Sequence, residues 1–293
     1  MNFENVEQVV YLGPQSSFCE IAKDKFVQKY NISAYSMGLS TIKQIVEYVD
    51  KNSNVLGVLP VENTLDGTIR EGLDNLITTK NENIKILSET IIPQNYCLLS
   101  KTTELYSITG VIGSPIMLGQ CHKFIENELP LNLNIVEATS SYEAARLLDG
   151  YNLTYSSIGT EKTAQIFNLN ILKSNINDDK YNYTRFILIG DYNTELTGDD
   201  KTTIALSCKD RPGALVELLN VFNNKKINIS YISSHPSRFS LDEHILIINL
   251  DGHYNDANIV SAIEDVKNYT KMFRCLGSYE KCKFSQDILT TQL

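Results

Sequence analysis

The segment Val55–Val61, which reads VLGVLPV, is an uninterrupted apolar run that ends in the polar tripeptide Glu62-Asn63-Thr64. Such a run predicts a strand that is buried on both faces of a sheet. Residues 42–49 before it carry apolar side chains at helical spacing, and a second helix is expected from about Thr68 to Leu76. Strands that alternate with helices indicate an α/β fold with a largely parallel sheet.

The same alternation extends over the first two thirds of the chain. Ser16 or Ser17 is a suitable cap for a helix that carries Phe18 and Phe26, and Ser141 for a helix over 143–148. A further helix is expected over 118–129. The other predicted strands are 9–12, 96–99, 110–112, 134–136, 156–158 and 185–189. Because ligands bind beyond the carboxyl ends of such strands, Ser16 and residues 62–64 are candidates for a site.

The last third of the chain has a different organisation. Residues 193–200 are polar, which is typical of a linker. The pattern after them predicts strand, helix, strand, strand, helix and strand within about 80 residues, which is a ferredoxin-like order.

Composition excludes several classes of protein. The chain has 293 residues, a formal net charge of -9 and no basic tract, which argues against nucleic acid or an anionic membrane surface as a partner. It lacks a signal peptide and any stretch of roughly 20 apolar residues, so we expect a cytoplasmic protein. The six cysteines match no zinc spacing and are expected to be free thiols, and the histidines show no ligand spacing, so no metal site is expected.

Several separated segments resemble the prephenate dehydratase family, in the expected order and over nearly the whole chain. They are Tyr11-Leu12-Gly13-Pro14 with Phe18, the segment GVLPVENTLDGT from Gly57 to Thr68, Pro115 with Gln120-Cys121, the helix start Ser140-Ser141-Tyr142-Glu143-Ala144-Ala145, and Asn182-Tyr183-Thr184-Arg185-Phe186. Lys209–Leu215 and Ile227–Arg238 resemble the ACT domain that accompanies this family.

The resemblance implies two α/β subdomains, of the type II periplasmic-binding-protein kind, with a cleft between them and a ferredoxin-like ACT domain after them. It implies a catalytic domain at 1–193, with subdomain one at about 1–85 and 172–193 and subdomain two at about 86–171. Residues 194–200 are then the linker and 201–293 the ACT regulatory domain. The implied activity converts prephenate to phenylpyruvate, carbon dioxide and water in L-phenylalanine biosynthesis, without a metal or organic cofactor.

The residues expected to be catalytic are Thr184, Asn63, Gln120 and Glu62. The enzyme must help a ring hydroxyl to leave while a carboxylate departs. The hydroxyl of Thr184 can donate a hydrogen bond to the leaving oxygen, although it is too weak an acid for full proton transfer at neutral pH. Glu62 is a candidate proton donor if burial raises its pKa. The amides of Asn63 and Gln120 can donate to substrate oxygens without adding charge.

Residues expected to contact the substrate are Thr64, Ser114, Ser141, Arg185 and Phe186. The guanidinium of Arg185 suits a carboxylate. In a regular strand, however, Arg185 and Thr184 point to opposite faces. Arg185 is therefore either a direct ligand or a scaffold residue that pairs with Glu62, and both alternatives stay open. Ser141 is expected to act mainly as a helix cap.

The resemblance also implies that phenylalanine binds between two ACT domains of a homodimer or homotetramer. The residues expected at that effector site are Gly213, Ala214, Leu215, Asn228, Ser234, His235 and Pro236. Three segments depart from the family pattern. Ser16-Ser17-Phe18-Cys19 replaces Gly-Thr-Phe-Ser, Gly113-Ser114-Pro115 replaces Ser-His-Pro, and Ser233-Ser234-His235-Pro236 replaces Glu-Ser-Arg-Pro.

Two other functions remain compatible with the sequence. An arogenate dehydratase would remove the same groups from the amino analogue of prephenate. An amino-acid sensor without chemistry would use the same two lobes and ACT domain, but it has no need of the hydroxyl of Thr184. A solute-binding protein is a third reading, which the absent signal peptide disfavours.

Overall fold

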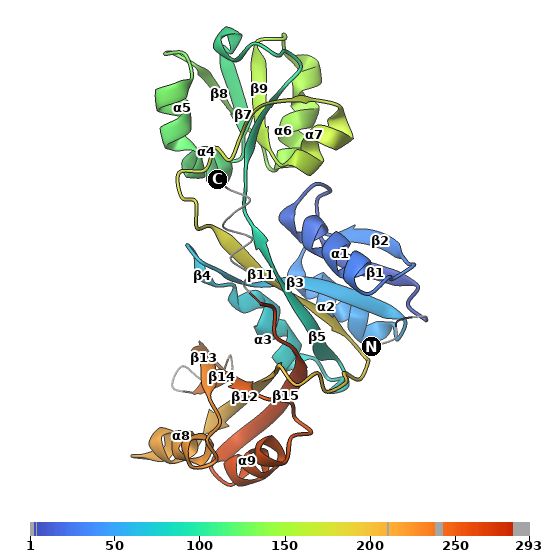
Figure 1. Ribbon diagram of the computed structural model, residues 1–293, viewed down its shortest axis with the longest axis vertical. Helices are drawn as coiled ribbons and strands as arrows, with labels where there is room; N and C mark the ends of the chain where they lie inside the picture. The colour runs from blue at the N-terminus through green and yellow to red at the C-terminus, as the bar shows by residue number, and fades with distance from the viewer. Residues whose placement is uncertain (1–2, 4, 210, 238–242, 284–293) are drawn as a thin grey trace.

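The computed structural model describes residues 3, 5–209, 211–237 and 243–283, which form three sheets arranged one after another along the longest axis of the molecule (Figure 1). Asp210 and Arg238, which belong to the segments compared with the ACT domain, lie outside the described residues, as do residues 284–293. None of the helices in the described part is long and apolar enough to cross a membrane.

The first sheet has the strand order β2-β1-β3-β11-β5. Its strands are β1 (Gln8–Leu12), β2 (Tyr35–Leu39), β3 (Val55–Asn63), β5 (Lys85–Pro93) and β11 (Tyr183–Gly190), and the short β4 (Gly67–Thr68) pairs with β3. β1 is parallel to β2 and β3, whereas β11 is antiparallel to β3 and β5. Four of the five main strands therefore run in one direction, as expected for a largely parallel sheet, and β11 runs opposite to them because it enters from the second lobe.

Helices cover both faces of the first sheet. The helix α1 (Phe18–Lys29), capped by Ser17, packs on one face against a core that includes Leu56 and Phe186. On the other face, α2 (Ile42–Lys51) and α3 (Arg70–Thr78) pack on the apolar side chains of β3. The apolar run at residues 55–61 thus lies in a central strand that is covered on both faces, as predicted.

The second sheet has the order β10-β6-β9-β7-β8 and is also mixed. Its strands are β6 (Cys97–Ser100), β7 (Gly110–Gly113), β8 (Asn134–Glu137), β9 (Tyr155–Gly159) and β10 (Asn170–Ser174). Its helices are α4 (Pro115–Gln120), α5 (His122–Glu128), α6 (Ser141–Leu147) and α7 (Glu161–Phe167), with 3-10 turns η1 (Leu105–Ser107) and η2 (Leu148–Gly150). The single helix predicted over 118–129 is two helices, because the backbone of Cys121 leaves the helical region at φ -121° and ψ 19°.

The boundary between the two lobes differs from the expected one. β5 pairs with β11 in the first sheet, so the chain enters the second lobe after Pro93 rather than after residue 85. The chain crosses again between β10 and β11, and two connections therefore join the lobes (Figure 1). The two-lobed α/β architecture expected from the family resemblance is confirmed.

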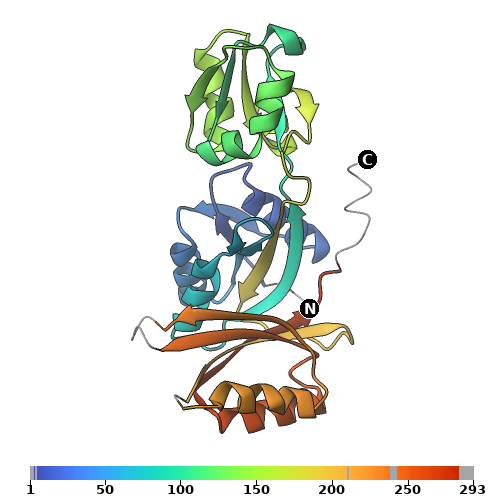
Figure 2. The same cartoon turned by 90° about the vertical axis from the view of Figure 1, so that its left-hand side faces the viewer.

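The third sheet is antiparallel, with the order β13-β14-β12-β15. Its elements follow the predicted βαββαβ order: β12 (Asp200–Cys208), α8 (Ala214–Asn224), β13 (Ile229–Pro236), β14 (His244–Asp251), α9 (Ala257–Lys267) and β15 (Thr270–Glu280). Both helices lie on one face of this sheet (Figure 2). Side chains on its other face, including Ala205, Ile247 and Tyr279, share a core with β3, β11 and α3 of the first lobe. The third sheet is therefore packed directly against the back of the first.

Candidate active site

Thr184 and Asn63 stand opposite each other on the neighbouring strands β11 and β3, and both side chains are buried. The side-chain nitrogen of Asn63 donates to the hydroxyl of Thr184 at 2.9 Å. The same Nδ2 also lies 2.8 Å from Oδ1 of Asn182 and 3.2 Å from the carbonyl of Tyr183, so its two hydrogens serve three acceptors. Because the Thr184 oxygen accepts from Asn63, its own hydrogen remains available to a ligand.

A bulge in β3 orients the side chain of Asn63 toward Thr184. Arg185 pairs with Glu62, but the next residue of β11, Phe186, pairs with Pro60, which leaves Val61 as an extra residue in β3. An extra residue reverses the alternation of side chains beyond it. As a result, Asn63 shares the face of Thr184, and Glu62 shares the opposite face with Arg185.

A chain of amides links this pair to the second lobe. Oδ1 of Asn182 accepts from Asn63, and its Nδ2 donates to Oε1 of Gln120 at 3.1 Å. Gln120 is the last residue of α4, and its side-chain nitrogen is a donor that can serve another acceptor. Asn182 is buried and was missing from the predicted catalytic residues, although it is the first residue of the signature that contains Thr184.

Arg185 lies on the face away from this amide chain. Its Nε donates to Glu62 at 2.9 Å and its Nη1 to Glu89 of β5 at 3.0 Å. Burial alone would lower the pKa of Arg185, but the carboxylates of Glu89 and Glu62 raise it above its ordinary value. The guanidinium is therefore a permanently charged part of the scaffold, and this contact favours the pairing alternative over direct binding of a substrate carboxylate.

Three of the residues expected at the substrate have structural partners. The hydroxyl of Thr64 donates to the carbonyl of Tyr181 at 2.6 Å, and the side chain of Ser114 caps α4 by accepting from the backbone of Met117 at 3.3 Å. Phe186 is 1% exposed and belongs to the core under α1. Thr64 and Phe186 therefore have a structural role next to the site.

Serine and threonine hydroxyls from the two lobes meet at the cleft. Ser16 is fully buried, and its hydroxyl lies 3.5 Å from that of Ser141 in the second lobe. The hydroxyl of Thr160, at the start of α7, donates to the carbonyl of Ser16 at 3.2 Å. The cap of α6 is Ser140 and not Ser141, since Ser140 accepts from the backbone of Glu143 at 3.1 Å. Ser141 is thereby left to face the first lobe.

Ion pairs at α1 also bridge the lobes. Lys162 of α7 reaches Glu20 at 3.0 Å and also pairs with Asp24, both on α1. Glu20 accepts from the backbone of Ser16 at 2.7 Å and from the hydroxyl of Tyr11 at 3.1 Å. Burial pushes the pKa of Asp24 upward, but hydrogen bonds from Lys162 and Lys23 outweigh it and hold that pKa below its ordinary value. These pairs fasten the second lobe to the first.

Residues of both lobes in the described part of the chain line two hollows at the lobe boundary. One has a volume of about 740 Å³ and is lined by Tyr11 and Gln15 from the first lobe and by Ser140 and Arg146 from the second. The other, of about 670 Å³, is lined by residues that include Phe18 and Lys162. Thr184 and Asn63 are not among the lining residues of these two hollows.

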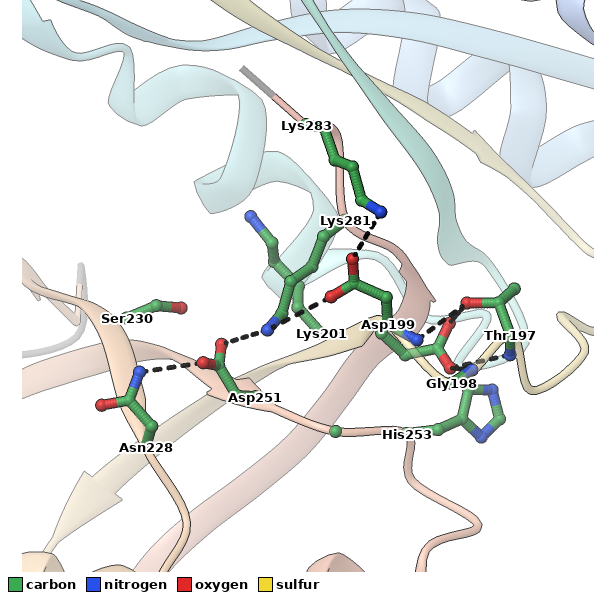
Figure 3. A network of polar contacts seen from close by, with 12 residues as sticks. Thr197, Gly198, Asp199, Lys201, Asn228, Ser230, Asp251, His253, Lys281 and Lys283 are labelled. Atoms are coloured by element: carbon green, nitrogen blue, oxygen red, sulfur yellow. Dashed lines mark hydrogen bonds and ion pairs between the residues drawn. The ribbon is translucent and has the colours of Figure 1, made fainter. Parts of the chain in front are cut away.

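The residues expected to bind an effector lie at two ends of the third sheet. Gly213, with φ +81°, precedes α8 at the end where Ser234 and Pro236 also lie. Asn228 lies at the opposite end and donates to Asp251 at 2.8 Å; Asp251 pairs in turn with Lys281 at 3.1 Å (Figure 3). His235 is 1% exposed and contacts Asp74 of α3, so its side chain faces the first lobe. Within one chain these residues do not form a single site.

The chain matches two protein-family models. The model described as prephenate dehydratase matches residues 9–194, and the ACT domain model matches residues 202–268. The bifunctional chorismate mutase/prephenate dehydratase of Aquifex aeolicus (strain VF5) is 32% identical, over 96% of this chain and 75% of that protein. The prephenate dehydratase of Methanocaldococcus jannaschii is 31% identical, over 92% of this chain and 97% of that protein.

A solved structure has the same architecture. It is described as the prephenate dehydratase of Arthrobacter aurescens in complex with L-Phe, and it superposes with a TM-score of 0.80 at 27% sequence identity. The match covers 94% of this chain and 90% of that one, so the likeness includes all three sheets.

Proposed function

The chain belongs to the prephenate dehydratase family and carries an ACT domain, and from this premise we propose that it converts prephenate to phenylpyruvate in L-phenylalanine biosynthesis. In this reaction the bond from the ring to its carboxylate breaks and carbon dioxide leaves. The electron pair of that bond forms the last double bond of the aromatic ring and expels the ring hydroxyl. The hydroxyl takes up one proton and departs as water.

The observation that carries the proposal is the hydrogen bond from Asn63 to the Thr184 oxygen. It fixes the orientation of the hydroxyl, so that the hydrogen of Thr184 points to the departing hydroxyl of the substrate. A fixed donor stabilises the negative charge that develops on that oxygen in the transition state. Thr184 thus acts as a neutral hydrogen-bond donor, and Gln120 supplies a second amide near the same place.

Glu62 has a supporting role in this proposal. Its carboxylate accepts from Arg185 on the face of the sheet that is turned away from the Thr184 hydroxyl. A proton donor must come within hydrogen-bond reach of the group it protonates. We therefore assign Glu62 and Arg185 to the scaffold and leave the proton to solvent that enters with the substrate.

The contacts between the lobes support a site that limits the amount of water around the departing carboxylate. Ser16, Ser141 and Thr160 close the cleft from both sides, and Lys162 fastens α7 to α1. A departing carboxylate is converted to neutral carbon dioxide, so poor solvation of the carboxylate favours its loss. The hydroxyls of Ser16 and Ser141 are then candidates for contact with the substrate.

We assign regulation by L-phenylalanine to the third sheet. The solved relative described with L-Phe supports this, as does the backbone of Gly213, whose positive φ allows a ligand to approach closely. β13 is an edge strand. If two copies pair antiparallel along this edge, Asn228 of one copy approaches Ser234 and Pro236 of the other. The effector site is therefore proposed to lie between two chains.

The domain organisation and context follow from the same premise. We propose a catalytic domain at 1–193, a linker at 194–200 and the ACT regulatory domain at 201–293. The protein acts as a cytoplasmic homodimer or homotetramer, without nucleic acid, membrane or cofactor as a partner.

The test is an assay with two substrates. The purified protein is incubated with prephenate and, separately, with arogenate, and phenylpyruvate is followed by its absorbance in base and phenylalanine by chromatography, with and without added phenylalanine. Rapid formation of phenylpyruvate from prephenate is the expected result. Preference for arogenate would instead identify an arogenate dehydratase. Heat of phenylalanine binding in calorimetry without turnover of either substrate would identify a sensor.

A further inference from the structure

Glu89 is a buried carboxylate of β5 that the proposed reaction does not use. It is 2% exposed, and three donors surround it. Nη1 of Arg185 lies at 3.0 Å, Nζ of Lys201 at 2.9 Å and the backbone nitrogen of Cys282 at 2.9 Å. A buried carboxylate is costly unless it is paired and hydrogen-bonded, so this one requires all of its partners.

The three donors come from two different domains. Arg185 belongs to β11 of the catalytic domain, whereas Lys201 lies in β12 of the ACT domain and Cys282 follows β15. Glu62, Arg185, Glu89 and Lys201 together carry no net charge, and they form one continuous line of ion pairs. The line therefore begins at the catalytic strands and ends inside the ACT domain.

The ACT domain touches this line at further points. A cavity of about 30 Å³ separates Glu62 and Arg185 from Thr203 and Tyr279 of the ACT sheet, which leaves room for about one water molecule. The hydroxyl of Tyr231 lies 2.9 Å from that of Thr68. Thr68 pairs with Glu62 across β3 and β4. A displacement of the ACT sheet would therefore change the surroundings of both Glu62 and Arg185.

The line of ion pairs includes Arg185, which is the residue next to Thr184 in β11. Arg185 follows Thr184 in β11, and Glu62 precedes Asn63 in β3, so the ion pair and the catalytic pair are consecutive rungs of the same two strands. β11 and β5 are antiparallel and lie side by side between the lobe boundary and the ACT domain (Figure 1). Rotation of Arg185 out of its place would turn the backbone that carries Thr184.

We propose that Glu89 is a positioning residue, which holds Arg185 so that β11 presents Thr184 to Asn63, and which makes this hold depend on the ACT domain through Lys201. The inference rests on the proposed function and deepens it by naming the route of regulation. A ligand that shifts β12 moves Lys201 and, with it, the carboxylate of Glu89. The hydrogen bond from Arg185 to Glu89 is then disturbed, and the orientation of the Thr184 hydroxyl changes.

The experiment compares three variants of the full-length protein. Glu89→Gln removes the charge at nearly constant volume, and Lys201→Gln removes only the ACT end of the line. The matched control is Glu280→Gln, because Lys29 and Glu280 also join α1 to β15 at 2.9 Å but are 42% and 47% exposed. The double variant Glu89→Gln with Lys201→Gln removes one negative and one positive charge, so it keeps the remaining charges balanced and replaces Glu89→Gln if that variant alone fails to fold.

The readouts separate positioning from general stability. We expect Glu89→Gln, or the double variant, to lower kcat by about tenfold or more with KM within about twofold, because a small misplacement of a catalytic group affects the chemical step. Lys201→Gln should have a kcat within about threefold of the wild-type value. The fraction of its activity that remains at saturating phenylalanine should be about fivefold or more higher than in the wild type. Calorimetry should still detect phenylalanine binding to it, and Glu280→Gln should behave as the wild type.

Hydrogen exchange of the amides of residues 183–187 gives a readout that does not need turnover. Phenylalanine should change this exchange in the wild type and in Glu280→Gln, but not in Lys201→Gln. Equal effects of Glu89→Gln and Glu280→Gln on kcat would overturn the positioning role, and unchanged exchange in wild type with phenylalanine would overturn the coupling. If the wild type does not convert prephenate, the proposed function fails, and the exchange comparison still decides the inference.

Discussion

The side-chain amide of Asn63 donates to the hydroxyl of Thr184 at 2.9 Å, and the two residues stand opposite each other on β3 and β11. This contact defines the chemical state of the hydroxyl. Its oxygen is occupied as an acceptor, and its hydrogen remains for the substrate. That direction of donation depends on the way the lobes and the ACT domain hold the two strands in place.

Asn63→Asp reverses the direction of donation. The new carboxylate can still accept from the backbone of Leu65 and Asp66, which now lie 2.8 and 2.9 Å from Oδ1, so the turn is expected to persist. It cannot donate, however, and it captures the hydrogen of Thr184. We expect kcat to fall by about 100-fold, which is typical for the loss of a fixed donor at a developing negative charge.

The matched control for Asn63→Asp is Asn152→Asp. Asn152 is exposed and accepts from the backbone of Thr154 at 3.1 Å, so the same chemical change occurs in a turn of the second lobe. Its kcat should stay at the wild-type value, and circular dichroism should show both variants folded. A fully active Asn63→Asp protein would contradict the assigned direction of donation.

Gly277→Ala tests the contact between the ACT sheet and the catalytic domain. Gly277 has φ +143°, and an added Cβ would lie 2.3 Å from the carbonyl oxygen of Ile86 in β5. Since both partners are backbone, neither can move away alone. We expect a loss of about 3 kcal/mol or more in the free energy of unfolding, measured by denaturant titration.

Gly119→Ala makes the same substitution at a position where the added Cβ meets no neighbour. Gly119 lies in α4, and nothing comes within 4 Å of an added Cβ. Alanine is a better helix former than glycine by about 1 kcal/mol, so this variant should be as stable as the wild type or slightly more stable. Equal losses in both variants would show that β15 and β5 are not in close contact.

The ion pair between Lys162 and Asp24 predicts a pH dependence of stability. The folded pKa of Asp24 lies below the ordinary value of about 3.9, so its contribution is fully present above that pH and is lost as pH falls through the folded pKa. Asp24→Asn should therefore lower the melting temperature at pH 7, and the difference from wild type should shrink below about pH 4. A difference that stays constant from pH 7 to pH 3 would contradict the pairing.

The strands and helices of the apolar core could be predicted from the sequence, because each carries its own periodicity. The run at 55–61 and the helix face at 42–49 both fill the positions expected of them. β5 was missed, because Ser88, Glu89 and Thr90 interrupt its apolar pattern. Those polar side chains are buried all the same, and Glu89 finds its partners in strands that lie about 100 residues further along the chain.

The geometry of the site depends on pairings that no local pattern contains. Simple alternation along β3 would put Asn63 on the same face as Val61, away from Thr184. The bulge at Val61 reverses this, and it exists only in the register with β11. The signature around Thr184 can be read from the sequence, but the contact between Arg185 and Glu89 and the amide bridge through Asn182 required the folded chain.

The role of the Thr184 hydroxyl is tested by the turnover of prephenate by Thr184→Val and Thr184→Ser, followed as phenylpyruvate. Valine keeps the shape of threonine and removes the hydroxyl, whereas serine keeps the hydroxyl. If Thr184 is the hydrogen-bond donor, the valine variant loses about 100-fold or more in kcat, while the serine variant stays within about tenfold of the wild type. A valine variant that turns over prephenate as fast as the wild type would contradict this role.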